Sequence, residues 1–352
     1  MKRRAFPGHG PETEARYQRA GKWLLATIYR DVRAAYWCMV NGVAIVKAAG
    51  GGIGTTGGFL VPTELSNAIL DLRETYGAFR RRARIIPMAS DTTTIARHTD
   101  AGKPTVFFVG ENTTTTESTV SLDSINLTAK KIGALVRISS ELEEDAETDI
   151  VDFIANEIAL AFAAQEDDCA FNGDGTSAYG KMRGIGTIAL DGNHNKAKVT
   201  ASVATFLTLT STDLAKLISG VQAAAIPNAA WFCSQTCFAE TFIRLAGAAG
   251  QDIPMFLVDG IMTPHYLGFP VILTQKLPLI ETTLTGKVML AFGDMYQGAV
   301  LGQRRGITIA RSADRYMDQN QIAVLATERF HAVVHDMGDN AGPGALAALV
   351  AP

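Results

Sequence analysis

The stretch that decides the fold covers residues 138–185 and reads ISSELEEDAETDIVDFIANEIALAFAAQEDDCAFNGDGTSAYGKMRGI. Its apolar residues recur at helical spacing: Ile150, Ile154, Ile158 and Phe162. This pattern predicts a helix over 149–171 that ends at the C-terminal cap Asn172-Gly173. At the standard rise its roughly 23 residues would span about 35 Å. That is longer than a small domain needs, so we expect a spine on which other elements pack.

The residues before this helix are acidic. Ser140 and Glu143 have the spacing of a capping box, and further carboxylates follow at Glu141, Glu144, Asp145, Glu147 and Asp149. Negative charge is favoured where a helix begins, because the first backbone N–H groups are unpaired. We therefore expect a short helix to start here, and the acidic run needs no role as paired catalytic carboxylates.

Composition limits the class of protein. The chain has 352 residues, 47% hydrophobic and 19% charged, which allows a large core and two or three domains. A formal charge of -3 gives no global attraction to nucleic acid, so any DNA contact should be local and non-specific. No run approaches the roughly 20 apolar residues that cross a bilayer, which predicts a soluble protein without a membrane partner.

The N-terminal part has the pattern of an arm. Apolar residues at helical spacing over 1–48 precede a glycine-rich run over 50–58, which predicts a flexible linker. The body then opens with an extended piece over 59–62 and a helix over 64–79. Four arginines follow and should form the strongest positive patch of the chain: Arg80, Arg81, Arg82 and Arg84.

Residues 89–135 are rich in threonine and alternate apolar with polar positions. Period two continues from Ile125 to Ile138, which is typical of strands, and residues 100–104 supply a turn. We predict one long two-stranded ribbon. Such a ribbon is marginally stable alone, so we expect it to lie on a neighbouring subunit.

The second half alternates helix and strand patterns without a Rossmann-like order. The expected helices cover 213–225 and 236–245, and the expected strands cover 230–233, 267–273, 288–292, 298–301 and 307–310. Residues 321–334 fit either a strand or a buried helix. Their β-branched residues favour a strand.

Three glycine-containing motifs are near misses for ligand sites. Residues 52–57 match the dinucleotide fingerprint, but a helical arm precedes them and an extended piece follows. Residues 175–181 are one short of a phosphate-binding loop, and Met182 stands where the magnesium-binding hydroxyl belongs. Residues 172–176 offer oxygens for calcium without the terminal glutamate, so a tight turn is favoured.

Cysteine and histidine form no recognisable site either. His331 and His335 are four apart, as zinc ligands on a helix would be, but no glutamate follows His331 and the segment is expected to be a strand. The cysteines lack zinc or redox spacing and should be reduced core residues of a cytoplasmic protein: Cys38, Cys169, Cys233 and Cys237. We therefore predict no catalytic, cofactor-binding or metal-binding residue, and no enzyme.

Several short motifs occur together in a specific order. They are GGFLVP at 57–62, ISSEL at 138–142, the helix over 162–167 running into NGDG at 172–175, GI at 184–185, LGFPV at 267–271, FGD at 292–294 and RF at 329–330. Over about residues 57–338 this ordered set resembles the major capsid proteins of tailed bacteriophages with the Hong Kong 97-like fold. Each motif alone is weak, whereas the ordered set is specific.

The resemblance implies an α+β fold with four parts. These are an N-terminal arm and linker (1–57), a peripheral domain with the spine helix (58–88, 136–185 and 292–334), an extended loop (89–135) and an axial domain (186–291 and 335–352). In this family the segment before the body often acts as a built-in scaffold that a phage protease removes. The ribbon matches the extended loop.

The implied function is self-assembly, as hexamers and pentamers, into an icosahedral shell around double-stranded DNA. The shell would be a virion capsid assembled in the cytoplasm of a bacterial host, with a portal, a scaffold and a maturation protease as further partners. An encapsulin-like nanocompartment shell is the alternative with the same fold, but it would lack the N-terminal extension. A soluble hydrolase with an unrecognised site is the alternative from another class, and it should run as a small oligomer.

Some relatives join a loop lysine of one subunit to an asparagine of another, with a glutamate taking the proton from the amine. Here Lys103 and Asn320 could be the two partners. Thr327 occupies the matching glutamate position, and its hydroxyl is no base at neutral pH. Glu328 is adjacent, but successive side chains of a strand point to opposite faces. We therefore expect a shell without this covalent cross-link.

Overall fold

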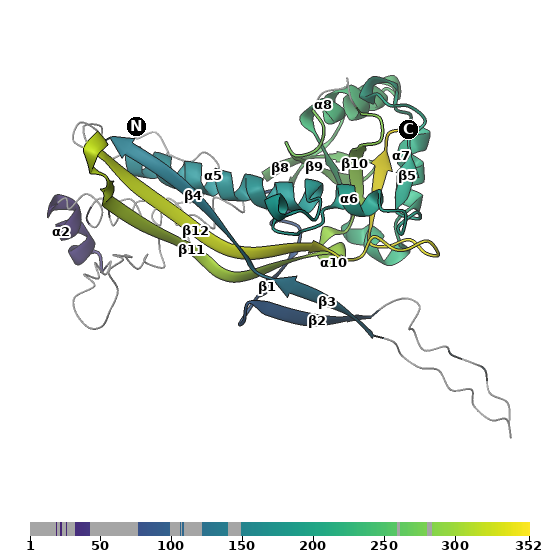
Figure 1. Cartoon of the computed structure of the whole chain (residues 1–352). Helices are drawn as coiled ribbons and strands as arrows, with labels where there is room; N and C mark the ends of the chain where they lie inside the picture. The colour runs from purple at the N-terminus through teal and green to yellow at the C-terminus, as the bar shows by residue number, and fades with distance from the viewer. Residues whose placement is uncertain are drawn as a thin grey trace.

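The computed structural model describes residues 19, 22, 26, 32–42, 77–98, 106, 108, 122–139, 149–258, 261–279 and 284–352. These residues form an α+β structure in three main parts (Figure 1): an elongated layer of long strands backed by a helix, a rounder domain that carries the C-terminus, and a thin ribbon. One helix of the N-terminal arm is also described, α2 (Val32–Val40). The α+β class is as the sequence predicts.

The elongated part combines one long helix with a four-stranded sheet. Helix α5 spans Asp149–Asn172, which confirms the predicted spine. The sheet has the order β1-β11-β12-β4. Its strands are β1 (Arg84–Pro87), β4 (Lys130–Ser139), β11 (Ala299–Tyr316) and β12 (Gln321–Val334). Ile158 and Phe162 of α5 are each 2% exposed, so this part of the predicted apolar stripe is buried, whereas Ile154 is half-buried.

A seven-stranded sheet forms the rounder domain, in the order β5-β13-β10-β6-β9-β8-β7. The strands are β5 (Lys198–Thr200), β6 (Ala230–Cys233), β7 (Met255–Val258), β8 (Ile261–Tyr266), β9 (Phe269–Leu273), β10 (Val288–Gly293) and β13 (Leu346–Val350). Trp231 and Phe292 are fully buried, and their ring centroids lie 4.3 Å apart. This aromatic pair joins the neighbouring strands β6 and β10 within the apolar core.

Short helices complete the structure. The α-helices are α6 (Ile185–Ala189), α7 (Ser211–Ser219), α8 (Gln235–Cys237), α9 (Arg244–Ala248) and α10 (Met295–Gly298), and a π-helical turn covers Phe238–Ile243. Single 3-10 turns cover Ser177–Tyr179, Phe206–Thr208, Ala223–Asn228 and Met317–Gln319. α7 begins with a capping box between Thr210 and Asp213, which satisfies the first N–H groups of the helix.

The paired ribbon is shorter than the sequence predicts. Strands β2 (Thr92–His98) and β3 (Leu122–Thr128) pair antiparallel, but β4 leaves them and pairs with β12. The prediction of one two-stranded ribbon over 89–135 is therefore wrong for residues 130–135. Period two continues through Ala129 with little interruption, and alternation identifies a strand without identifying its partner.

Other sequence expectations have mixed outcomes. Residues 321–334 form a strand as favoured, whereas the strands expected over 298–301 and 307–310 are parts of the single strand β11. The helix expected over 213–225 ends at Ser219, and a 3-10 turn containing Pro227 follows. The capping-box region near residue 140, the linker over 50–58, the piece over 59–62 and most of the helix over 64–79 lie outside the described residues.

Candidate functional site at the root of the ribbon

We call β2, β3 and their connection 99–121 the ribbon, and the part that touches the body its root. Alternation along β3 turns Ile125 and Leu127 inward, 6% and 0% exposed, against Met88 and Val300 of the body. Gly302 of β11 permits this approach, because a Cβ there would lie 3.0 Å from Leu127 and 2.8 Å from the sulfur of Met88. The root is therefore supported within the same chain, by β11.

One arginine connects the ribbon to the end of β12. Arg97 of β2 donates through Nε and Nη2 to Oδ2 of Asp123 on β3, at 3.0 and 2.8 Å. It also donates through Nη1 to the backbone carbonyl of His335. The N–H of Ser124 and the Arg97 guanidinium both hold the pKa of Asp123 below its ordinary value. Arg97 thus joins both ribbon strands to the body at one point.

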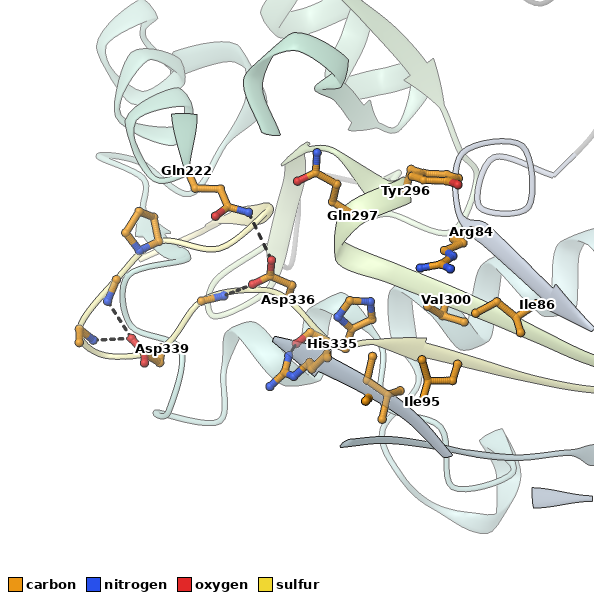
Figure 2. Close-up of a pocket in the computed structure, with 17 residues that line it drawn as sticks. Arg84, Ile86, Ile95, Gln222, Tyr296, Gln297, Val300, His335, Asp336 and Asp339 are labelled. Atoms are coloured by element: carbon orange, nitrogen blue, oxygen red, sulfur yellow. Dashed lines mark hydrogen bonds between the residues drawn. The ribbon is translucent and has the colours of Figure 1, made fainter. Parts of the chain in front are cut away.

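A groove of about 830 Å³ lies beside this point, between the ribbon root and the loop after β12. Figure 2 shows its lining: Arg84 and Tyr296 lie on one side together with the apolar Ile86, Ile95 and Val300, Asp336 and His335 lie near the middle, and Asp339 lies at the other end. Asp336 accepts from Nε2 of Gln222 at 3.4 Å. The groove therefore has apolar and basic side chains toward one end and a carboxylate at the other.

A second hollow of about 340 Å³ is lined by Arg97, Asp123, His331 and His335, among other residues. Burial and neighbouring cations lower the pKa of both histidines from 6.5 to about 4; the cation is Lys130 for His331, and Arg97 and Arg84 for His335. Both imidazoles are therefore neutral at pH 7. His331 lies in β12 and His335 just after it, so the pair is on a strand and not on a helix, as the sequence predicts. In the described part of the chain, no group of three or more His, Cys, Asp or Glu residues is placed to hold a metal ion.

The arginine-rich segment does not form one exposed patch, which corrects the sequence expectation. Arg80 is 3% exposed and donates two hydrogen bonds of 2.9 Å to Glu166 of α5. Its Nη2 also lies 3.7 Å from Oε1 of Glu328 on β12. Arg84, four residues on, lines the groove instead. Carboxylates distant in sequence neutralise Arg80, and the local charge pattern cannot reveal them.

The neighbouring carboxylate, Asp167, also holds this segment. Its two oxygens accept the backbone N–H groups of Ala78 and Phe79, at 3.0 and 2.8 Å. Burial raises its pKa from 3.8 to about 6, although these two N–H groups act in the opposite direction. Glu166 and Asp167 together fix residues 78–80 to the spine helix. Neither contact could be recognised from the sequence.

The face of the four-stranded sheet away from α5 is basic and partly apolar. Glu328 points toward α5, so alternation turns Thr327 and Arg329 to the other face. The matching residues of β4 are exposed there: Lys131, Leu135 and Arg137. Asp91 pairs with Arg329 at 3.0 Å. Leu135 and Leu325 are 43% and 36% exposed, which leaves apolar surface between the cations.

The residues considered for a cross-link lie apart within one chain. Asn320 is in the left-handed region at the β11–β12 turn, with φ of 52°, about 23 Å along β12 from Thr327. The Thr327 hydroxyl accepts from Arg305 at 3.1 Å, and Glu328 is fully buried on the opposite face. The expectation that Glu328 points away from Thr327 is confirmed. Lys103 lies outside the described residues.

The glycine motifs after α5 are structural. Thr176 N–H donates to Asp174 at 2.8 Å in a tight turn, as predicted for residues 172–176. A Cβ on Gly173 would lie 2.4 Å from the carbonyl oxygen of Cys169, and Gly184 donates its N–H to the Gly173 carbonyl at 2.8 Å. Residues 175–181, which resemble a phosphate-binding loop, belong to this turn and follow a helix and not a strand. The motif over 52–57 lies outside the described residues.

The four cysteines are buried free thiols, as predicted. Among the helices that the structure describes, none is long and apolar enough to cross a membrane.

Comparison with known proteins gives a consistent picture. The model of the phage capsid family matches residues 57–337. The major capsid protein of Klebsiella oxytoca phage phiKO2 is 30% identical over 135 residues, which are 38% of this chain and 30% of that protein. The matched segment thus spans less than a third of that relative.

Solved structures share the fold. The capsid protein of an empty GTA particle has a TM-score of 0.57 at 17% identity, covering 89% of this chain and 97% of the other. The SrpI encapsulin of Synechococcus elongatus has a TM-score of 0.52 at 13% identity, covering 89% and 94%. At these identities the likeness establishes the fold alone.

Proposed function

The chain belongs to the phage capsid family, and we propose that it is the major capsid protein of a tailed phage or prophage, which self-assembles into an icosahedral shell. The observation that carries this proposal is the family match over 57–337, which covers the spine helix, the ribbon and every strand of the two sheets except β13. Membership of this family makes the chain a structural protein, which sets aside the soluble-hydrolase alternative.

The parts of the fold suggest how the chain is divided in the shell. We assign α5 and the four-stranded sheet to a peripheral domain, and the seven-stranded sheet to an axial domain that meets its copies at the centres of hexamers and pentamers. The ribbon is the extended loop and residues 1–57 are an arm. The pairing of β4 with β12 moves residues 130–135 from the loop to the peripheral domain.

The ribbon supports contact with a neighbouring subunit. Two apolar side chains of its connection are open to solvent in the single chain, Val106 at 91% exposure and Phe108 fully. Apolar side chains exposed to this degree are typical of an interface. The basic and leucine-bearing face of the four-stranded sheet is suited to receive a segment with apolar residues and the carboxylates Asp100, Glu111 and Glu117.

The shell would enclose double-stranded DNA, held without sequence preference, and would form in the cytoplasm of the bacterial host. A portal, a scaffold and a maturation protease are the further partners that such a role requires. The encapsulin-like alternative is supported by the shared fold with the SrpI structure. It predicts a protein cargo in place of nucleic acid.

One experiment tests the proposal and separates it from that alternative. The full-length protein is purified from cells that also express the neighbouring phage genes, and particles are imaged by negative stain and assayed for nuclease-protected DNA. We expect closed icosahedral particles with protected DNA. Particles that hold a protein cargo and no DNA favour the encapsulin-like function. A protein that stays monomeric at high concentration overturns both.

A further inference from the structure

The ribbon joins the body beside two histidines, one buried and one half-buried. His331 of β12 is 9% exposed, and His335 lies just beyond the end of that strand. Both line the 340 Å³ hollow together with Arg97 and Asp123 of the ribbon. In the part of the chain that the structure describes, Nδ1 of neither histidine has a hydrogen-bond partner. The ribbon root and the two imidazoles therefore share one hollow, and neither Nδ1 has an acceptor there.

The charges around these imidazoles are mainly cationic. Arg97 of β2 and Arg84 of β1 act on His335, and Lys130 of β4 acts on His331. The same hollow is lined by Lys181 and Arg183, from the loop that follows α5, and by His194, which comes after α6.

The nearby carboxylates are already engaged. Asp123 pairs with Arg97, Asp191 pairs with Arg183 and His194, and Asp336 accepts from Gln222 and from the N–H of Gly338. A proton on His331 or His335 would therefore add positive charge beside cations, at groups whose charged form partial burial already disfavours.

We propose that the ribbon root is an acid-sensitive latch, in which protonation of His331 and His335 releases the outer part of β2 and β3 from the end of β12. Lifting the ribbon lets water reach both imidazoles and separates Arg97 from His335. The Arg97–Asp123 pair lies within the ribbon and moves with it. Leu127, nearer the base of the ribbon, stays packed on the body and acts as the pivot.

The direction of the pH effect follows from the two forms. With the ribbon closed, burial and the nearby cations hold the pKa of each histidine at about 4, and with the ribbon open it returns toward 6.5. The free-energy difference that favours the closed form is therefore fully present above pH 6.5 and is lost as the pH falls toward 4. Between pH 7 and pH 5 the equilibrium constant for opening should rise about 20-fold for each histidine, and about 500-fold for both.

Hydrogen exchange of the full-length subunit tests this inference. Amides of β2 and β3 are compared with those of the core strand β10 at pH 7, 6 and 5, after correction for the intrinsic pH dependence of exchange. We expect protection of the ribbon to fall by the factors above while β10 stays protected. The double variant His331→Gln/His335→Gln should keep its ribbon protection constant. His265→Gln, in β8 of the rounder domain, should behave like the unmodified chain.

Two outcomes would overturn the latch: ribbon protection that does not change between pH 7 and 5, or a loss of protection that persists in the double variant. The single variant His335→Gln provides a second test. Its loss of ribbon protection between pH 7 and 5 should be about half that of the unmodified chain on a logarithmic scale. Circular dichroism and melting at pH 7 check that each variant is folded. The readout concerns the subunit, so its failure leaves the proposed shell function standing.

Discussion

At the scale of single residues, a buried ion cluster fastens the start of the body to the spine helix. Arg80 makes two hydrogen bonds to Glu166 and approaches Glu328, and all three side chains are nearly inaccessible to solvent. Such a cluster contributes little relative to an apolar replacement of the whole set, but removing one member leaves an uncompensated buried charge. The cluster therefore fixes where residues 78–80 attach to α5, and it adds little to the free energy of unfolding compared with an apolar cluster.

We expect Arg80→Met to lower the free energy of unfolding by about 3 to 5 kcal/mol, because Glu166 and Glu328 lose their cation while remaining buried. Urea unfolding of the unassembled subunit measures this, with an unchanged slope as the check on two-state behaviour. Arg305→Met is the matched control, since Arg305 is exposed. Equal urea midpoints for Arg80→Met and Arg305→Met would show that the ion cluster around Arg80 does not stabilise the fold.

The residues available for a covalent link lead to a second prediction at this scale. Thr327 is bound to Arg305, and Glu328 faces Arg80 on the other side of β12, so neither can take a proton from an amine near Thr327. Mature particles boiled in denaturant should release single chains of about the 37.5 kDa mass of the polypeptide. A ladder of covalent pentamers and hexamers that disappears in Lys103→Ala would contradict this expectation.

At the scale of elements, α5 is the support on which the elongated part is built. Ala159 and Phe162 are 0% and 2% exposed, whereas Leu160 on the other side of the helix is 46% exposed. The helix lies along the sheet near β12 and β4 (Figure 1). Its stability therefore depends on one buried face and an unbroken backbone.

Two substitutions test this role of the helix. Phe162→Ala should cost about 3 to 5 kcal/mol through lost burial and a cavity. Ala159→Pro should cost about 3 kcal/mol or more, because it removes a backbone hydrogen bond and clashes with the preceding turn. Leu160→Ala is the control and should have a much smaller effect. The yield of soluble protein and the melting temperature are the readouts, and unchanged melting in both core variants would refute the assignment.

At the scale of the whole molecule, the ribbon root is held by the chain itself, while Val106 and Phe108 are exposed and, as proposed above, contact a second copy. Removing the connection 99–121 and joining β2 to β3 by a short glycine-containing turn should leave a folded subunit. It should form no closed shells, because many small contacts are lost together. Negative-stain images measure the yield of particles, and an undiminished yield would show that assembly does not use the ribbon.

The sequence by itself determined the elements whose signal is local. The 3.6-residue period over 149–171 predicted α5 to within one residue, because it reflects which face of the helix is buried. The β-branched residues of 321–334 favoured a strand over a buried helix, and β12 confirms the strand. The order of short motifs over 57–338 was sufficient to identify the family, since turns such as Gly173 with Gly184 require glycine for steric reasons.

Only the tertiary structure decided which elements meet. Strand β4 pairs with β12 and not with β2, Arg80 reaches Glu166 across 86 positions, and Arg97 reaches His335 across 238. Local periodicity shows that a residue is buried or that a segment is extended, but it carries no information about the partner. The ribbon root and its two neutral histidines therefore became visible only once the strands were assembled, because their chemistry depends on burial beside charges from distant parts of the chain.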